Sequence, residues 1–343
     1  MPKLPMSAAL GVAITLVVLT CLAAWRYEGF LSPYNVHSAL RYYSMFTIVA
    51  LGMCFVIMTG GIDLSVGAVA ALASVVSALA STWGLVPGLL AGLAAGVVAG
   101  MINGLVITRL KILPFIATLA MMLAAKGTAL LLAQNQTVSA SYDTLFTTLG
   151  QGDLFADYLP EWATGDDAGV FGLALNYVLG MPTPFWIVVL VYAAGWIINL
   201  STPFGRHALA VGGGAEASKL MGLPVNSTVF GVYVISGFCS GLAGVILAAQ
   251  FGAGQPIEGI GWELISIASV VVGGTLLSGG QGSIGGTLVG SLLLGILYTI
   301  LNFENGMGWI SLSAYWQSVV RGTFLLVVVI LQSKINARQN APA

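Results

Sequence analysis

The sequence contains very little charge. Only 7% of its 343 residues are Asp, Glu, Lys or Arg, whereas 58% are hydrophobic. A soluble chain carries roughly a quarter charged residues, so an ordinary water-exposed surface is excluded. The net charge of −1, without a cluster of Lys and Arg, also excludes the basic surface of a nucleic-acid-binding protein. We expect most of the chain to lie in a lipid bilayer.

Groups for redox, metal and nucleotide chemistry are scarce as well. Cys21, Cys54 and Cys239 fall within apolar runs and are expected to be buried thiols with no disulfide or metal role. There are only two histidines and no HExxH pattern, so nothing supports a metal site. The GxxxxGK[ST] pattern of a nucleotide-phosphate loop is also absent. This chain is expected to bind no cofactor, and ATP would have to be bound by another chain.

Long apolar runs dominate the sequence instead. Nothing alternates with the period of a barrel strand, so helices must cross the membrane. We predict an all-α integral membrane protein, a single transmembrane domain over residues 1–343 with about ten segments. The 45 glycines suit close packing of helix backbones. The predicted segments are 6–25, 42–59, 64–83, 86–108, 112–133, 184–200, 226–250, 263–280, 283–303 and 316–332.

Charge in the loops predicts the orientation. Cytoplasmic loops of membrane proteins are enriched in Lys and Arg. The long loop at about 134–183 contains acidic residues and no Lys or Arg, so it is predicted to lie outside. Both termini are then cytoplasmic, and the apolar run that follows Lys3 is expected to stay as the first helix. The basic residues of the predicted inner side are Lys3, Arg109, Lys111, Arg206, Lys219, Lys334 and Arg338.

Residues 59–67, TGGIDLSVG, interrupt two apolar runs with a carboxylate and three glycines. An intramembrane carboxylate is a functional candidate because burying it unpaired is costly. Asp63 is therefore predicted either to line a translocation path or to cap the helix that follows by accepting from the backbone N–H groups of residues 65 and 66. Both roles are compatible with the sequence.

A second glycine-rich break resembles the first. Residues 273–280, GGTLLSGG, align with residues 60–67, and both interrupt an apolar region. The segments flanking Gly60–Gly61 and Gly279–Gly280 are short, so re-entrant halves are an alternative to full crossings. The repetition predicts two similar halves with their breaks near the interface between them, where a substrate path is commonly built.

Several residues on or beside the apolar segments are candidates for a substrate path. The polar residues of these segments also have a structural interpretation, such as an interhelical hydrogen bond. For Lys126 that interpretation is snorkelling or pairing. With Asp63, the substrate-path candidates are Gly60, Gly61, Ser65, Asn103, Phe115, Thr118, Glu263, Gly274 and Ser278.

The predicted cytoplasmic loop at about 201–225 contains a second informative stretch. Gly212, Gly213 and Gly214 interrupt the chain, and residues 215–221 can form a short helix that ends at Gly222. An apolar face on this helix favours a docking element for a partner protein, with a solvated linker as the alternative. The coupling candidates are Gly213, Gly214, Ala215, Glu216, Ala217, Lys219, Leu220 and Gly222.

Several motifs resemble the permease subunits of bacterial ATP-binding-cassette importers for sugars of the ribose, xylose and galactose type, most closely the galactofuranose branch. The similarity covers nearly the whole chain. It is carried by TGGIDLSVG at 59–67, PFIATLAMM at 114–122, GxGxELxxIAxxVxGGTLLSGG at 259–280, NFENG at 302–306 and YWQSVVRG at 315–322. Three positions depart from the family pattern: Gly214 replaces Asn, Ile265–Ser266 replaces Asp-Ala, and Lys126 replaces Arg, which loses the planar fork of the guanidinium.

The resemblance implies a sugar permease of the bacterial inner membrane that works by alternating access. It also implies partners: ATPase subunits that bind ATP-Mg, a periplasmic or extracellular sugar-binding protein, and a second permease as homodimer or heterodimer. Residues 212–223 would correspond to the helix that rests on the ATPase. Two other classes of protein remain alternatives: an ion-coupled secondary transporter or channel, and an intramembrane enzyme. For an intramembrane enzyme, the sequence offers no nucleophile-base pair.

Overall fold

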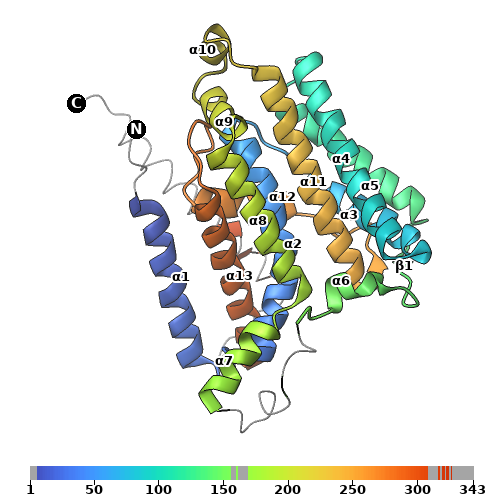
Figure 1. Cartoon of the computed structure of the whole chain (residues 1–343), viewed down its shortest axis with the longest axis vertical. Helices are drawn as coiled ribbons and strands as arrows, with labels where there is room; N and C mark the ends of the chain where they lie inside the picture. Colours follow the sequence, from blue (N-terminus) through green and yellow to red (C-terminus); the bar gives the residue numbers. More distant parts are fainter. Residues whose placement is uncertain are drawn as a thin grey trace.

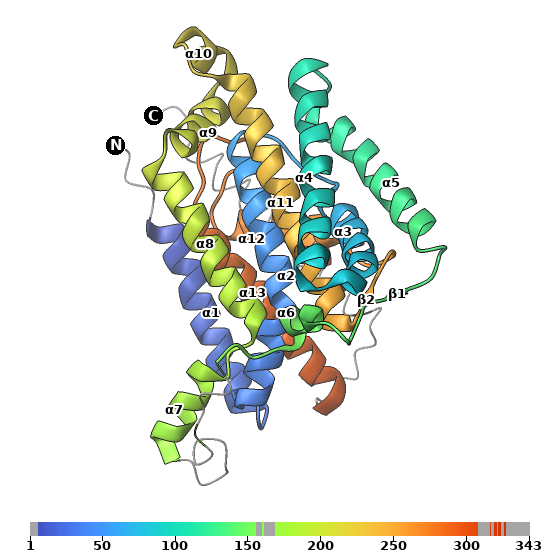
Figure 2. The same ribbon diagram turned by 45° about the vertical axis from the view of Figure 1, so that its right-hand side comes forward.

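The protein is a bundle of helices (Figures 1 and 2). A computed structural model describes residues 6–155, 160 and 169–307, with a few single positions between 316 and 326. Within these residues the only strands are β1 (Val138–Ser139) and β2 (Ala253–Gly254), which pair antiparallel. The α-helices are α1 (Met6–Arg26), α2 (Pro33–Met58), α3 (Val66–Ala80), α4 (Leu85–Arg109), α5 (Pro114–Leu132), α6 (Thr148–Gln151), α7 (Gly169–Leu179), α8 (Thr183–Ser201), α9 (Pro203–Gly213), α10 (Ala215–Leu220), α11 (Val225–Phe251), α12 (Trp262–Val272) and α13 (Ile284–Met307), with short 3₁₀ turns at Ser81–Trp83 and Leu145–Thr147.

In the described part of the chain, seven helices are long and apolar enough to cross a membrane. They are α2, α3 with the 3₁₀ turn after it, α4, α5, α8, α11 and α13. The predicted segment at 263–280 is shorter than expected, because α12 has only 11 residues and stops before Gly273. Eleven residues rise about 17 Å, too little for the hydrocarbon core. The predicted segment at 316–332 and the basic residues near the C-terminus lie outside the described residues.

Three helices that were not predicted lie where the sequence predicts loops. The predicted outer loop contains α6 and α7, and the predicted cytoplasmic loop contains α9, which starts with Pro203 at its first turn. Helix α9 was not among the segments predicted from the sequence. Proline at the first helical position and apolar residues buried on one face explain the helix. Figures 1 and 2 place α10 at one end of the bundle and α7 at the other.

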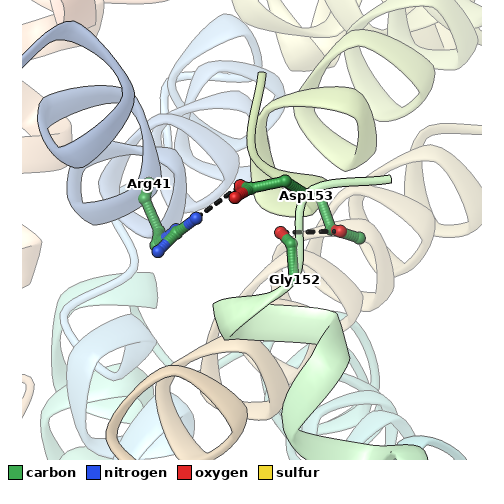
Figure 3. A network of polar contacts seen from close by, with 4 residues as sticks. Arg41, Gly152 and Asp153 are labelled. Carbon is green, nitrogen blue, oxygen red and sulfur yellow. Dashed lines mark hydrogen bonds and ion pairs between the residues drawn. The ribbon is translucent and has the colours of Figure 1, made fainter. Parts of the chain in front are cut away.

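Helix α2 begins at Pro33 instead of near residue 42. Its N-cap is Ser32, whose Oγ accepts a hydrogen bond of 3.3 Å from the Asn35 backbone N–H. Arg41 consequently lies inside the helix, and it forms an ion pair with Asp153 in the segment after α6 (Figure 3). Beside this pair, the Gly152 carbonyl accepts hydrogen bonds of 2.9 Å from both the backbone N–H and the hydroxyl of Thr183. These contacts tie α2, α6 and α8 together.

Helices α2 and α11 form the centre of the bundle and bury most of their side chains. Helix α4 packs on α11 through a glycine at every fourth position, a spacing that puts all of them on one face. A Cβ on Gly96 would lie 2.3 Å from the Gly237 carbonyl oxygen, so the two backbones touch. The tight packing predicted from glycine content is concentrated here. The α4 stripe comprises Gly88, Gly92, Gly96, Gly100 and Gly104.

Helix α1 lies at the edge of the bundle and packs on α13 (Figures 1 and 2). Tyr27, just after α1, packs against Phe303, and its hydroxyl donates to the Glu304 carboxylate. Burial, together with this carboxylate, raises the pKa of Tyr27. Cys54 and Cys239 are buried as predicted, but Cys21 is exposed because α1 presents that face outward.

Candidate functional site

The first glycine break ends α2 and begins α3. Thr59 closes α2, and Gly60 follows with a φ of +78°, a left-handed conformation that glycine adopts without strain. The Gly60 N–H donates to the Ile57 carbonyl and the Gly61 N–H to the Val56 carbonyl, at 2.8 and 3.2 Å. This is a Schellman-type helix end. It turns residues 61–65 into the interior of the bundle.

Asp63 lies in this turn and is only 2% exposed. Its Oδ1 accepts hydrogen bonds from the backbone N–H of Ser65 at 2.9 Å and from the Ser65 hydroxyl at 2.6 Å. Its Oδ2 accepts from the hydroxyl of Ser236 on α11, at 2.7 Å. Of the two backbone N–H groups that the predicted cap required, at residues 65 and 66, only that of Ser65 is bound to Asp63. Ser65 is itself the N-cap of α3, and no side chain of the described residues caps that helix. The carboxylate also links Ser65 to α11, which the sequence did not indicate.

Two further predicted residues extend the network. Asn103 on α4 donates from Nδ2 to the Ser65 hydroxyl at 3.0 Å. Thr118 on α5 donates from Oγ1 to the Ile62 carbonyl at 3.3 Å as well as to a carbonyl of its own helix. We call Asp63, Ser65, Asn103 and Ser236 the Asp63 cluster. All four side chains are buried, so the cluster is closed to solvent.

Tyr233 borders the Asp63 cluster and was also missed from the sequence. It lies one turn before Ser236 on α11 and is fully buried, and a Cβ on Gly61 would lie 2.6 Å from its hydroxyl oxygen. That hydroxyl has no hydrogen-bond partner among the described residues. Residues three apart in a helix lie on the same face, so the spacing of Tyr233 and Ser236 was the one sequence signal that these two residues lie together.

The second break repeats the helix end of the first. Helix α12 stops at Val272, and Gly274 has a φ of +91°. The Gly274 N–H donates to the Val271 carbonyl and the Thr275 N–H to the Val270 carbonyl, the same pattern as at Gly60. The structural equivalent of Gly60 is therefore Gly274, so the predicted alignment with Gly273 was shifted by one residue. The two breaks are therefore aligned by their matching hydrogen bonds, and this alignment differs by one residue from the alignment by identical residues.

The two breaks touch each other. The Gly280 N–H donates to the Met58 carbonyl at 3.0 Å, and a Cβ on Gly60 would lie 3.3 Å from the Ser278 carbonyl oxygen. Ser278 itself is exposed, and so is Phe115 at the start of α5. Glu263 is half-buried in the first turn of α12. No hydrogen bond joins Phe115, Glu263 or Ser278 to the Asp63 cluster within the part of the chain that is described.

The predicted docking helix is present as α10, Ala215–Leu220. Gly214 ends α9 and begins α10, and Gly222 follows with a φ of +80°. The Ser218 hydroxyl is buried and donates to the Ala210 carbonyl of α9 at 2.8 Å. Leu220 and Met221 are 89% and 69% exposed. The predicted coupling residues Gly213, Ala215, Glu216, Ala217 and Lys219 are exposed too, and Gly214 is half-buried.

The described residues offer no metal centre. They contain no group of three His, Cys, Asp or Glu side chains that could hold a metal ion. Lys126 is half-buried on α5, and within the same residues no hydrogen bond or ion pair to its ammonium group is present.

Comparison with known proteins agrees with this architecture. Residues 35–329 match the family described as "Branched-chain amino acid transport system / permease component". The ribose import permease protein RbsC of Bacillus subtilis is 38% identical over 330 residues, covering 96% of this chain and 94% of that protein. The Haemophilus influenzae RbsC is 34% identical, with coverages of 95% and 93%.

The xylose transport system permease protein XylH of Escherichia coli K12 is 31% identical over 370 residues, covering 94% of this chain and 91% of XylH. No solved structure matches the chain. The family match spans most of the sequence, and the similarity to these permeases extends over nearly their whole length. The chain therefore belongs to the transport-system permease-component family and is a multi-pass membrane permease.

Proposed function

We propose that this chain is the transmembrane subunit of an ATP-binding-cassette importer that moves a monosaccharide into the bacterial cytoplasm. The relatives named for ribose and xylose support a sugar over the amino acids named in the family description, because their similarity covers more than nine tenths of this chain. Ribose, xylose and galactofuranose are the candidates. A neutral, hydroxyl-rich substrate suits a chain in which only 7% of the residues are charged.

The observation that supports an ATPase partner is the exposure of α10. Leu220 of α10 and Met221 just after it are exposed, and α10 lies at one end of the bundle (Figure 1). Burying each of these side chains would contribute about 1.5–3 kcal/mol to an interface. The partner binds ATP-Mg, and its closure moves α10. A sugar-binding protein delivers substrate at the opposite, outer face, and a second permease, identical or homologous, completes the path. In this assembly both termini of the chain are cytoplasmic.

The test is reconstitution of the permease with candidate ATPase and sugar-binding proteins. Proteoliposomes receive labelled ribose, xylose, galactofuranose or, as a control, leucine, with ATP or a non-hydrolysable analogue inside. We expect uptake of one sugar that requires ATP and the binding protein, together with ATP hydrolysis stimulated by the loaded binding protein. Uptake of leucine alone would contradict the sugar assignment.

An ion-coupled secondary transporter or channel is the other candidate class. It predicts uptake by the permease alone, without ATP, and a dependence on an ion gradient that is lost in Asp63→Asn. The same vesicles distinguish the two classes when a proton or sodium gradient replaces ATP. Gradient-driven uptake without partner chains would overturn the importer assignment.

A further inference from the structure

Three segments that are distant in the sequence meet near the cytoplasmic loop. They are the end of α2 at Met58–Gly60, the last turn of α9 at Gly212–Gly213, and the end of the second break at Ser278–Gly280. The Gly280 N–H donates to the Met58 carbonyl at 3.0 Å, which joins two of these segments. We call this contact the glycine junction.

The glycine junction is packed backbone to backbone. A Cβ on Gly212 would lie 1.9 Å from the Met58 carbonyl oxygen and 2.4 Å from the Gly280 nitrogen. A Cβ on Gly279 would lie 2.6 Å from the Gly60 nitrogen and 3.0 Å from the Gly212 Cα. Real Cβ atoms do not approach other atoms this closely. Gly212 therefore touches both breaks at once, and only glycine permits that contact.

The glycine junction continues directly into α10. Gly214 is the single residue between α9 and α10, and Ser218 of α10 binds back to α9 through the Ala210 carbonyl at 2.8 Å. The Ser218 backbone N–H also donates to the Gly214 carbonyl at 2.9 Å. A displacement of α10 consequently carries the last turn of α9 with it.

We propose that Gly212 is a positioning residue through which movement of α10 reaches both glycine breaks. Contacts between side chains absorb small shifts by changing rotamer, whereas touching backbones transmit them because interiors are close-packed and little compressible. A small displacement of α9 then moves the end of α2 and the loop before α13 together. This inference rests on the proposed function, since it identifies the route from the ATPase contact to the breaks.

Gly212→Ala and Gly127→Ala provide a matched pair for the test. Gly212→Ala places a methyl group in the glycine junction, whereas Gly127 on α5 has no heavy atom within 4 Å of its added Cβ. Both substitutions replace a helical glycine by alanine, which favours the helix. In the full assembly we expect Gly212→Ala to retain ATPase binding and basal ATP hydrolysis but to lose about tenfold in sugar uptake and in stimulation by the binding protein.

Gly127→Ala should stay within about twofold of wild type in every measurement. Uptake by Gly212→Ala at the wild-type rate, or an equal loss in both variants, would overturn the role of Gly212. If wild type itself shows no ATP-driven uptake, the proposed function fails, whatever the variants do.

Hydrogen exchange on the wild-type assembly tests the route without any substitution, including the case in which Gly212→Ala does not fold. ATP binding should change amide exchange in residues 58–61, 210–214 and 276–281 together. A change confined to 210–221, with both breaks unaltered, would refute transmission through the glycine junction.

Discussion

At the residue scale, Asp63 is an intramembrane carboxylate whose interactions are satisfied inside the protein. Its two oxygens accept three hydrogen bonds, and only 2% of the residue is exposed. In this conformation it holds the first break to α11 and does not face an open path. A contact with substrate stays a prediction that requires the breaks to move.

Ser236 and Ser240 on α11 allow the Asp63 contact to be measured. Ser236→Ala removes the donor to Asp63 Oδ2, so we expect the free energy of unfolding to fall by about 1–3 kcal/mol. Ser240 is equally buried one turn later, but its hydroxyl has no partner among the described residues. Ser240→Ala should change stability by less than about 0.5 kcal/mol. The measurement is denaturant or thermal unfolding of the purified permease, and equal losses would contradict a special role for Ser236.

At the element scale, α4 and α11 are held by backbone contact along the glycine stripe. Close approach lets dispersion between backbones replace the hydrophobic force that is missing between helices in lipid. The stripe also puts Asn103, next to Gly104, within reach of Ser65. The packing of this helix pair thus positions one member of the Asp63 cluster.

Gly96→Ala tests this packing, with Gly127→Ala on α5 as its control. The new methyl group at position 96 would lie 2.3 Å from the Gly237 carbonyl oxygen and 2.6 Å from the Gly241 Cα. We expect a loss of about 1–3 kcal/mol in stability. Gly127 has no heavy atom within 4 Å of its added Cβ, and alanine favours a helix over glycine by about 1 kcal/mol, so Gly127→Ala should be neutral or stabilising. Thermal unfolding in detergent compares the two, and a destabilised Gly127→Ala would count against the steric explanation.

At the scale of the whole molecule, α10 projects from one end of the bundle and α7 from the other (Figure 2). The α10 end continues into the glycine junction and, through the first break, into the Asp63 cluster. The permease is therefore organised as a chain of contacts from an exposed helix to a buried polar network. Its partner is expected to dock at α10 and not at α7.

Paired substitution of Leu220→Ser and Met221→Ser tests where the ATPase docks. These side chains are 89% and 69% exposed, so their loss should leave the fold intact while weakening ATPase binding by more than about tenfold. Val170→Ser on α7 is the control, because Val170 is 88% exposed at the opposite end. Co-purification of the ATPase with each permease variant measures the effect. Undiminished association of the Leu220/Met221 variant would contradict the proposed surface.

Composition and local pattern by themselves determined the class of this protein and many of its elements. Apolar runs without strand alternation leave helices as the way to satisfy the backbone in lipid, so an all-α membrane bundle follows directly. Gly214, Gly222 and the apolar residues between them predicted α10, and Asp63 two residues before Ser65 predicted the bond from the Ser65 N–H. These features depend on neighbours in the chain.

Tertiary structure alone decided which distant groups meet. Ser236 reaches Asp63 across 173 positions, and Gly212 touches Met58 and Gly280 because the ends of α2 and α9 converge with the loop before α13. A serine or glycine looks the same in sequence whether it faces lipid or a neighbouring backbone, so no local pattern distinguishes Gly212 from Gly213. The sequence TGGIDLSVG predicts a break in the helix. Only packing shows that its carboxylate accepts a hydrogen bond from α11 and that Gly60 lies against the second break at Ser278 and Gly279.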